Sequence, residues 1–248
     1  MSGPHAEELL TSILQRAQAE GALGARPILE VIAHARSFVA ALPDGALSIM
    51  DLGSGAGIPG LVVALDRPLL QVTLVDRRAK RVDALRRAVT ALGWGARVTV
   101  LEADADQLSR DPTWARTQDA VVARGFGEPA VTLPIAGRLV RPGGWVVISE
   151  PPAEHGSRWD VEWVRSLGMG PPERRGAVVR FHVEHHPGES PSNPHGDMYP
   201  EVRWSGEFDN TSGPGGCQPK GRRGEDHVRG QSVGQHCPPW SSSLGHRP

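Results

Sequence analysis

The feature that most constrains the fold of this chain is a glycine-rich segment between an apolar run and a helical pattern. Residues 51–60 read Asp-Leu-Gly-Ser-Gly-Ala-Gly-Ile-Pro-Gly and directly follow the apolar run 46–52. Apolar residues from 58 to 64 then begin a helix, which Pro68 ends. Glycines at such a junction accept positive φ angles and let a ligand approach the backbone. The segment is therefore typical of an α/β domain that binds a nucleotide-like cofactor.

The chain up to about residue 187 alternates between strand and helix patterns. Helices are predicted over 6–20, 28–42, 79–92, 130–140 and 159–167. Strands are predicted over 46–52, 71–75, 97–101, 120–123, 145–149 and 177–184. This alternation implies a parallel, Rossmann-like sheet with helices on both faces. We expect an N-terminal helical segment at 1–45, a cofactor-binding α/β domain at 46–187 and a disordered tail at 188–248, where the periodicity is lost.

Two classes of cofactor suit the glycine-rich loop. A dinucleotide places its pyrophosphate at the helix N-terminus, and residues 55–60 match the Gly-x-Gly-x-x-Gly fingerprint. The negative charge of Asp51 would oppose a pyrophosphate, and Pro59 lacks the N–H that a phosphate cradle uses. S-adenosylmethionine carries an ammonium and a sulfonium but no phosphate. The loop therefore favours S-adenosylmethionine over a dinucleotide.

Acidic residues follow two further strands. Asp76 ends the second strand, where a carboxylate can accept hydrogen bonds from both ribose hydroxyls of a nucleoside cofactor. Residues 103–106, Ala-Asp-Ala-Asp, follow the third strand, where an adenine would lie. Carboxylates at successive strand ends favour a cofactor site over a loop that merely connects a strand to a helix.

Three segments together resemble the glucose-inhibited division protein B family, whose members are small-subunit ribosomal RNA methyltransferases G. They are residues 51–60, Leu74-Val75-Asp76 followed by Lys80, and Ala123-Arg124-Gly125-Phe126. The similarity covers roughly residues 28–150. The resemblance implies a class I S-adenosylmethionine-dependent methyltransferase fold, with 46–187 as the methyltransferase domain. It also implies methylation of guanine N7 in small-subunit ribosomal RNA. A cytoplasmic enzyme is the default expectation, because the chain shows no signal-peptide pattern or membrane-spanning run and the predicted core has no cysteine.

The resemblance and the strand-end argument together define the predicted site. Predicted cofactor-binding residues are Asp51, Gly53, Gly55, Ile58, Asp76, Ala105, Asp106 and Arg124. By the resemblance, Arg124 is also the predicted catalytic residue. A bidentate arginine on guanine O6 and N7 would block the nucleophile, so Arg124 should contact O6 alone or hold the cofactor or a phosphate. Phe126 could stack on a base, although a core aromatic is the simpler interpretation.

The chain departs from the family pattern at charged positions. The family's Asp-Ser-Leu is Arg36-Ser37-Phe38 here, its Arg-x-Glu is residues 104–106, and its Lys-Gly is Glu150-Pro151. One hypothesis is an ion pair of swapped polarity between Arg36 and Glu150. The alternatives are a diverged methyltransferase for a small molecule or protein, and a cofactor-binding protein without transferase activity. A nicotinamide oxidoreductase is disfavoured by Asp51 and Pro59.

Charge and composition bound the partners. The formal net charge is −1, so RNA contact would require a local basic patch. A candidate patch surrounds the helix 79–92 and consists of Arg77, Arg78, Lys80, Arg81, Arg86 and Arg87, although a solvated helix face is the simpler interpretation. No apolar run is long enough for a bilayer, and residues 1–20 lack a signal-peptide pattern. The Cys and His spacings match no zinc pattern, so we expect no metal.

Overall fold

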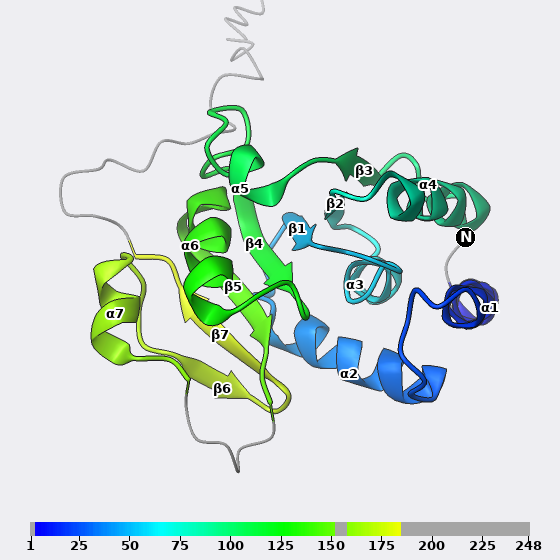
Figure 1. The fold of residues 1–248 in the computed structure, drawn as a ribbon, viewed down its shortest axis with the longest axis horizontal. Helices are drawn as coiled ribbons and strands as arrows, with labels where there is room; N and C mark the ends of the chain where they lie inside the picture. Colours follow the sequence, from blue (N-terminus) through cyan, green and yellow to red (C-terminus); the bar gives the residue numbers. More distant parts are fainter. Residues whose placement is uncertain (1–2, 152–157, 185–248) are drawn as a thin grey trace, which may run out of the picture. The chain divides into compact units, whose positions relative to one another are not determined.

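The computed structural model describes residues 3–151 and 158–184, which form a sheet covered by helices on both faces (Figure 1). The strand order is β3-β2-β1-β4-β5-β7-β6. The strands are β1 (Ser48–Leu52), β2 (Gln71–Asp76), β3 (Val98–Glu102), β4 (Gln118–Ala123), β5 (Val140–Ser149), β6 (Glu173–Arg175) and β7 (Val178–His182). The helices are α1 (Pro4–Ala19), α2 (Ile28–Ala41), α3 (Gly60–Asp66), α4 (Ala79–Leu92), α5 (Ala105–Leu108), α6 (Pro129–Leu139) and α7 (Val161–Ser166). The predicted tail at 188–248 lies outside the described residues.

The sheet is parallel from β3 to β5 and antiparallel beyond it. β1 to β5 pair in the order 3-2-1-4-5, which is also the beginning of the Rossmann order. β7 runs antiparallel to β5, and β6 runs antiparallel to β7. The prediction of a wholly parallel sheet is therefore wrong at this edge. The reason is local, because only Gly176 and Ala177 separate β6 from β7, and two residues suffice for a hairpin but not for a parallel crossover.

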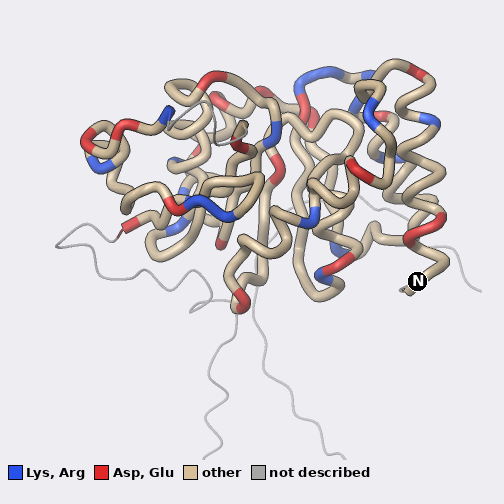
Figure 2. Tube along the Cα trace, turned by 90° about the horizontal axis from the view of Figure 1, so that it is seen from below, with Lys and Arg blue, Asp and Glu red and all other residues tan. Residues whose placement is uncertain are grey.

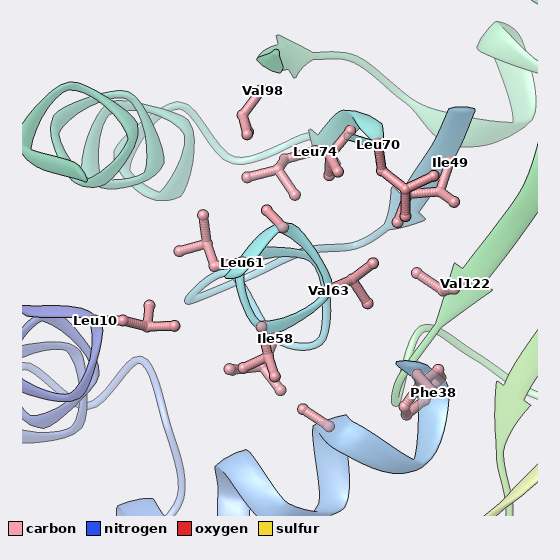
Figure 3. Packing of buried hydrophobic residues seen from close by; sticks show 14 of the residues in the cluster. Leu10, Phe38, Ile49, Ile58, Leu61, Val63, Leu70, Leu74, Val98 and Val122 are labelled. Atoms are coloured by element: carbon pink, nitrogen blue, oxygen red, sulfur yellow. The ribbon is translucent and has the colours of Figure 1, made fainter. Parts of the chain in front are cut away.

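Alternate side chains of each strand enter two separate cores. Ile49 and Val122 face the layer of α1, α2, α3 and α4, whereas Met50 and Val121 face the layer of α5, α6 and α7. Figure 3 shows the first core gathered around α3. Leu10 and Phe38 come from α1 and α2, so the predicted N-terminal segment 1–45 shares a core with the sheet. No helix in the described ranges is long and apolar enough to cross a membrane.

The proposed ion pair between Arg36 and Glu150 is wrong, because each side chain has other partners. Arg36 on α2 donates to Glu7 of α1 at 2.8 Å and to Asp66 of α3 at 3.0 Å, so it joins three helices. Glu150, just after β5, is nearly fully buried. It accepts a hydrogen bond from the Trp159 indole at 2.7 Å and pairs with Arg158 at 3.3 Å. Both charged side chains that depart from the family pattern thus have partners within the fold, but not each other.

Candidate functional site

The glycine-rich loop is fastened to β2 through one buried serine. Ser54 donates its backbone N–H to the carbonyl of Val75 at 2.9 Å, and its hydroxyl accepts the Val75 N–H at 3.1 Å. The same hydroxyl donates to the backbone carbonyl of Asp51 at 2.9 Å. Gly53 just before it has a φ of +66°, and a Cβ there would lie 2.8 Å from the ring of Phe126. The loop therefore lies against β2 on one side and Phe126 on the other.

Asp76 lies beneath the loop and holds its backbone. The carboxylate is 4 % exposed and accepts the Gly55 N–H at 3.0 Å and the Arg78 N–H at 2.9 Å. Arg81 approaches the same carboxylate at 3.6 Å. A carboxylate has about four acceptor positions, so two hydrogen bonds leave capacity for ribose hydroxyls. Asp76 thus holds the loop and still has acceptor positions available for a ligand.

Asp51, near the end of β1, is buried under the glycine-rich loop. Its side chain is fully buried and accepts the Gly60 N–H at 3.0 Å, while its Oδ1 has no hydrogen-bond partner among the described residues. Burial raises the pKa of Asp51 to about 7, against the opposing effect of the Gly60 hydrogen bond. That its charge faces the cation of a cofactor stays a prediction. In the structure the Asp51 side chain lies buried under the loop and is held there by the Gly60 N–H.

A pocket of about 340 Å³ opens beside the loop, and we call it the loop pocket. Gly53 and Asp76 line it from the ends of β1 and β2, and Ala105 and Asp106 line it from α5. Phe126 and the α6 residues Val131 and Ile135 complete an apolar side. The volume lies within the range of small-molecule sites, and an acidic edge beside apolar walls suits an adenosine group, while Arg77, Arg78 and Arg81 line the pocket around the start of α4. Four of the predicted site residues therefore meet at one hollow.

Asp106 is held by two arginines. Arg110 donates to both of its oxygens, at 3.0 and 2.8 Å, and Arg138 of α6 donates at 2.7 Å. Arg138 also donates to the Ser109 hydroxyl at 3.0 Å. Asp104 caps α5 by accepting the N–H groups of Asp106 and Gln107. The side chain that the sequence predicts at the adenine position is thus fixed by a network that the sequence did not predict.

Arg124, at the end of β4, does not line the loop pocket. It is half-buried and lies near Asp51 and His34, whose pKa values its charge lowers. Burial and the nearby Arg26 lower the pKa of Arg124 itself. Its guanidinium makes no ion pair within residues 3–151 and 158–184. Among the described residues it is therefore a cation without an ion-pair partner at the carboxyl edge of the sheet.

The remaining predicted residues take other positions. Ile58 is buried in the core under the loop, and Gly55 lines a second hollow between α1 and α4. His34 was missed by sequence reasoning, and its Nδ1 is buried without a hydrogen-bond partner among the described residues. Burial, followed by the charges of Arg124 and Arg26, lowers the pKa of His34. One helical histidine gives no sequence signal of this kind. No three His, Cys, Asp or Glu side chains in the described part gather as a metal site.

Known proteins resemble this chain in sequence over about half its length. One relative, from Rhizorhabdus wittichii, is 45 % identical over 95 residues, which cover 38 % of this chain and 42 % of that protein. Another, from Stenotrophomonas maltophilia, is 37 % identical over 134 residues, covering 51 % and 59 %. Both are named ribosomal RNA small subunit methyltransferase G. The chain thus spans about half the length of the curated relatives it matches.

The comparisons also bear on the fold and the family. The crystal structure of a Corynebacterium glutamicum protein superposes with a TM-score of 0.52 at 17 % identity, covering 73 % of this chain and 92 % of that one. This likeness supports the α/β fold expected from the sequence. A family model described as rRNA small subunit methyltransferase G, GidB, matches residues 12–151, which is more than half of the chain. The chain therefore belongs to the GidB family of rRNA small subunit methyltransferases G.

Proposed function

We propose that this protein is an S-adenosylmethionine-dependent methyltransferase that acts on guanine N7 of small-subunit ribosomal RNA, and hence in the cytoplasm. The observation that carries the proposal is the meeting of Gly53, Asp76 and Asp106 around one pocket in a chain of the GidB family. Membership of that family supports ribosomal RNA as the acceptor. The proposed methyltransferase domain is 46–187, with 1–45 as a helical segment.

The residues of the loop pocket fit S-adenosylmethionine. Asp76 would accept the ribose hydroxyls with its free acceptor edge, and Ala105 and Asp106 would flank the adenine. Gly53 would present bare backbone to the cofactor, because the absence of a side chain lets the Phe126 ring lie directly against the loop. Asp51, Gly55 and Ile58 would contribute by shaping the loop from below and behind.

The proposed chemistry demands little of the protein beyond positioning. Bound S-adenosylmethionine supplies an electrophilic methyl group on its sulfonium. Guanine N7 has an exposed lone pair, so no general base is needed, and the described wall of the loop pocket carries no histidine or cysteine. Catalysis would then rest on proximity and orientation. Arg124 would hold guanine O6, the cofactor or a phosphate, since its guanidinium has no ion-pair partner within the described residues.

A second candidate is a diverged methyltransferase for a small molecule or a protein. It is favoured by Glu150, which stands where the family usually has a lysine. Here Glu150 pairs with Arg158 and accepts a hydrogen bond from the Trp159 indole. The carboxyl end of β5 therefore offers no unpaired cation to an RNA phosphate at this position. A cofactor-binding protein without transferase activity is the third alternative.

Two measurements, made one after the other, test the proposal. Thermal unfolding with S-adenosylhomocysteine and with NAD tests the cofactor, and a hundredfold excess over Kd should stabilise the protein by about 2.7 kcal/mol. Labelled S-adenosylmethionine is then offered with small-subunit ribosomal RNA. Label in the RNA that is lost in Arg124→Ala supports the proposal. Binding of S-adenosylhomocysteine without label in RNA would leave the second and third candidates.

A further inference from the structure

A groove with basic edges runs between α1 and α4, next to the loop pocket. Its volume is about 450 Å³, and we call it the α1–α4 groove. Its floor consists of small apolar side chains from both helices, including Ala17, Ala84 and Ala88, and it reaches Gly55 of the glycine-rich loop. The two helices pack against each other along it (Figure 1). A concave surface of this size differs from the solvated helix face that the sequence pattern favours.

The charges around the groove are strongly one-sided. Five basic side chains line it, against the single acid Glu20: Arg16 from α1, and Arg78, Lys80, Arg81 and Arg87 from the start and flank of α4. Figure 2 shows basic segments crowded at the upper right of the view, beside the helix that begins at the N-terminus. The whole chain has a net charge of only −1, so this excess is local. Such a patch attracts a polyanion.

Most of these cations are available to a ligand. Arg16, Lys80 and Arg87 are exposed and make no ion pair with any residue of the described ranges. Lys80 and Arg87 are seven positions apart on α4, which is about 10 Å along the helix axis. Arg86, by contrast, pairs with Asp83 at 3.4 Å and does not line the groove. Only part of the predicted basic patch therefore faces the groove, and Arg86 belongs to the part that does not.

The groove adjoins the loop pocket, and two arginines stand between them. Arg78 and Arg81 line both hollows. Arg81 also reaches Asp76 at 3.6 Å, and its Nη1 lies 3.7 Å from the position of a Cβ on Gly55. A strand lying in the groove would therefore pass close to the pocket beside the glycine-rich loop. An acidic protein segment could also pair with these cations, but no feature of the loop pocket favours such a segment over RNA.

We propose that the α1–α4 groove binds the phosphodiester backbone of the RNA strand whose base is methylated, with Arg16, Lys80 and Arg87 on the phosphates. The inference rests on the proposed function for the identity of the polyanion. Phosphate contacts of this kind position the nucleic acid without reading its sequence. They release counterions, so affinity falls with salt at a slope of about −0.7 per phosphate for a single strand.

The test measures binding separately from methyl transfer. A short single-stranded RNA with a fluorescent end label is titrated with the full chain at several salt concentrations. Arg16→Gln, Lys80→Gln and Arg87→Gln should each weaken binding about fivefold at about 0.1 M salt and reduce the salt slope by about 0.7. Arg86→Gln, on the neighbouring position of the same helix, is the matched control and should change neither quantity. Gln has a helix propensity close to that of Lys and Arg, so α4 should stay folded.

The outcomes separate the groove from the proposed function. Affinity for S-adenosylhomocysteine should stay unchanged in all four variants, because none of the four residues lines the loop pocket. If the three groove variants bind RNA with the affinity and salt slope of the unmodified protein, the proposal that the groove binds RNA is contradicted. This holds even if the unmodified protein methylates RNA. Polyglutamate that displaces RNA as well as unlabelled RNA does at equal charge would also overturn it, in favour of an acidic protein partner. Failure of methyl transfer with normal groove-dependent RNA binding would count against the proposed function alone.

Discussion

At the residue scale, two glycines with nearly the same backbone angle have different surroundings. Gly53 has a φ of +66° and the Phe126 ring at 2.8 Å from a Cβ position, whereas Gly93 has a φ of +69° and nothing within 4 Å. Gly93→Ala should therefore cost only the left-handed strain, about 1 kcal/mol. Gly53→Ala should cost roughly 3 kcal/mol, because the ring must also move. Urea unfolding of both variants measures the difference. Equal losses in the free energy of unfolding would show that the Phe126 ring moves aside without cost and would contradict this prediction.

Asp76 should matter more to cofactor affinity than its neighbour on the pocket wall. Asp76→Asn places an amide among backbone N–H donors and removes an acceptor for ribose, so affinity for S-adenosylhomocysteine should fall about thirtyfold, or about 2 kcal/mol. Asp104→Asn is the control, because asparagine caps a helix as well as aspartate does. Isothermal titration calorimetry measures both. A similar affinity in the two variants would contradict the role of Asp76.

Asp51 should make stability depend on pH in an unusual direction. Its pKa is raised to about 7 in the folded protein, above the unfolded value, so the folded state binds more protons between about pH 4 and 7. The stability contributed by protonated Asp51 is fully present below about pH 4 and is lost as pH rises through 7. The slope is at most about 1.4 kcal/mol per pH unit. Asp51→Asn should flatten it in urea unfolding across this window, and an unchanged slope would contradict the burial argument.

The sequence predicts some residues of the site and misses others for a physical reason. Gly53 and Asp76 are predictable because parallel strands bring their carboxyl ends to one edge. The contact of Arg138 with Asp106 joins two elements 32 positions apart, and the burial of His34 depends on which face of α2 meets the sheet. The sequence also gives no sign that Asp51 is fully buried, because its burial depends on how the loop packs over the end of β1.

At the element scale, the quality of prediction follows the length and regularity of each segment. The helix 79–92 was predicted with the same bounds as α4, because its apolar stripe is long and Gly93 ends it in a left-handed conformation. β6 and α5 were missed because three or four residues carry no periodicity. β5 begins five residues before the prediction, since Pro142-Gly143-Gly144 reads as a turn but lies within an irregular strand.

One carboxylate links the strands β1, β4 and β5 at the end of the sheet where they begin. Asp119 accepts the N–H groups of Leu47 and Ser48 at 2.7 and 2.8 Å and pairs with Arg141 at 2.5 Å. Burial raises the pKa of Asp119, but Arg141 and the two N–H groups outweigh it, so the pKa is lowered. The stability it contributes is therefore present above the unfolded pKa of about 4 and lost as pH falls through the lower folded value.

Replacing this carboxylate should loosen the three strands together. Asp119→Asn should cost about 1–2 kcal/mol near neutral pH, because the nearly buried carboxylate loses its charge-assisted hydrogen bonds, while solvent screens part of the loss at Arg141, which is 41 % exposed. It should also reduce the loss of stability in acid. Asp44→Asn is the control, since Asp44 is fully exposed and solvent screens its pair with Arg67 at 3.6 Å, so this variant should unfold at nearly the same urea concentration as the unmodified protein. Comparable losses from both substitutions in urea unfolding would contradict this account.

At the scale of the whole molecule, the sheet brings distant segments to one edge. The glycine-rich loop, Asp76, α5 and the β4 end meet there, and the α1–α4 groove adjoins them. The N-terminal helices therefore serve both the core and the surface beside the site. The residues that depart from the family pattern are satisfied elsewhere in the fold, as Arg36 and Glu150 are. Whether the acceptor is ribosomal RNA is consequently the central question for this chain.

The most direct measurement is the position of the methyl group. Small-subunit ribosomal RNA from cells that lack this gene is incubated with the protein and S-adenosylmethionine, both as naked RNA and in assembled subunits. N7-methylguanine is then located by reduction and strand cleavage. The account predicts a single cleavage position at a guanine, absent with Asp76→Asn. Cofactor binding with no cleavage in either form of the RNA would contradict the central claim and favour another methyl acceptor.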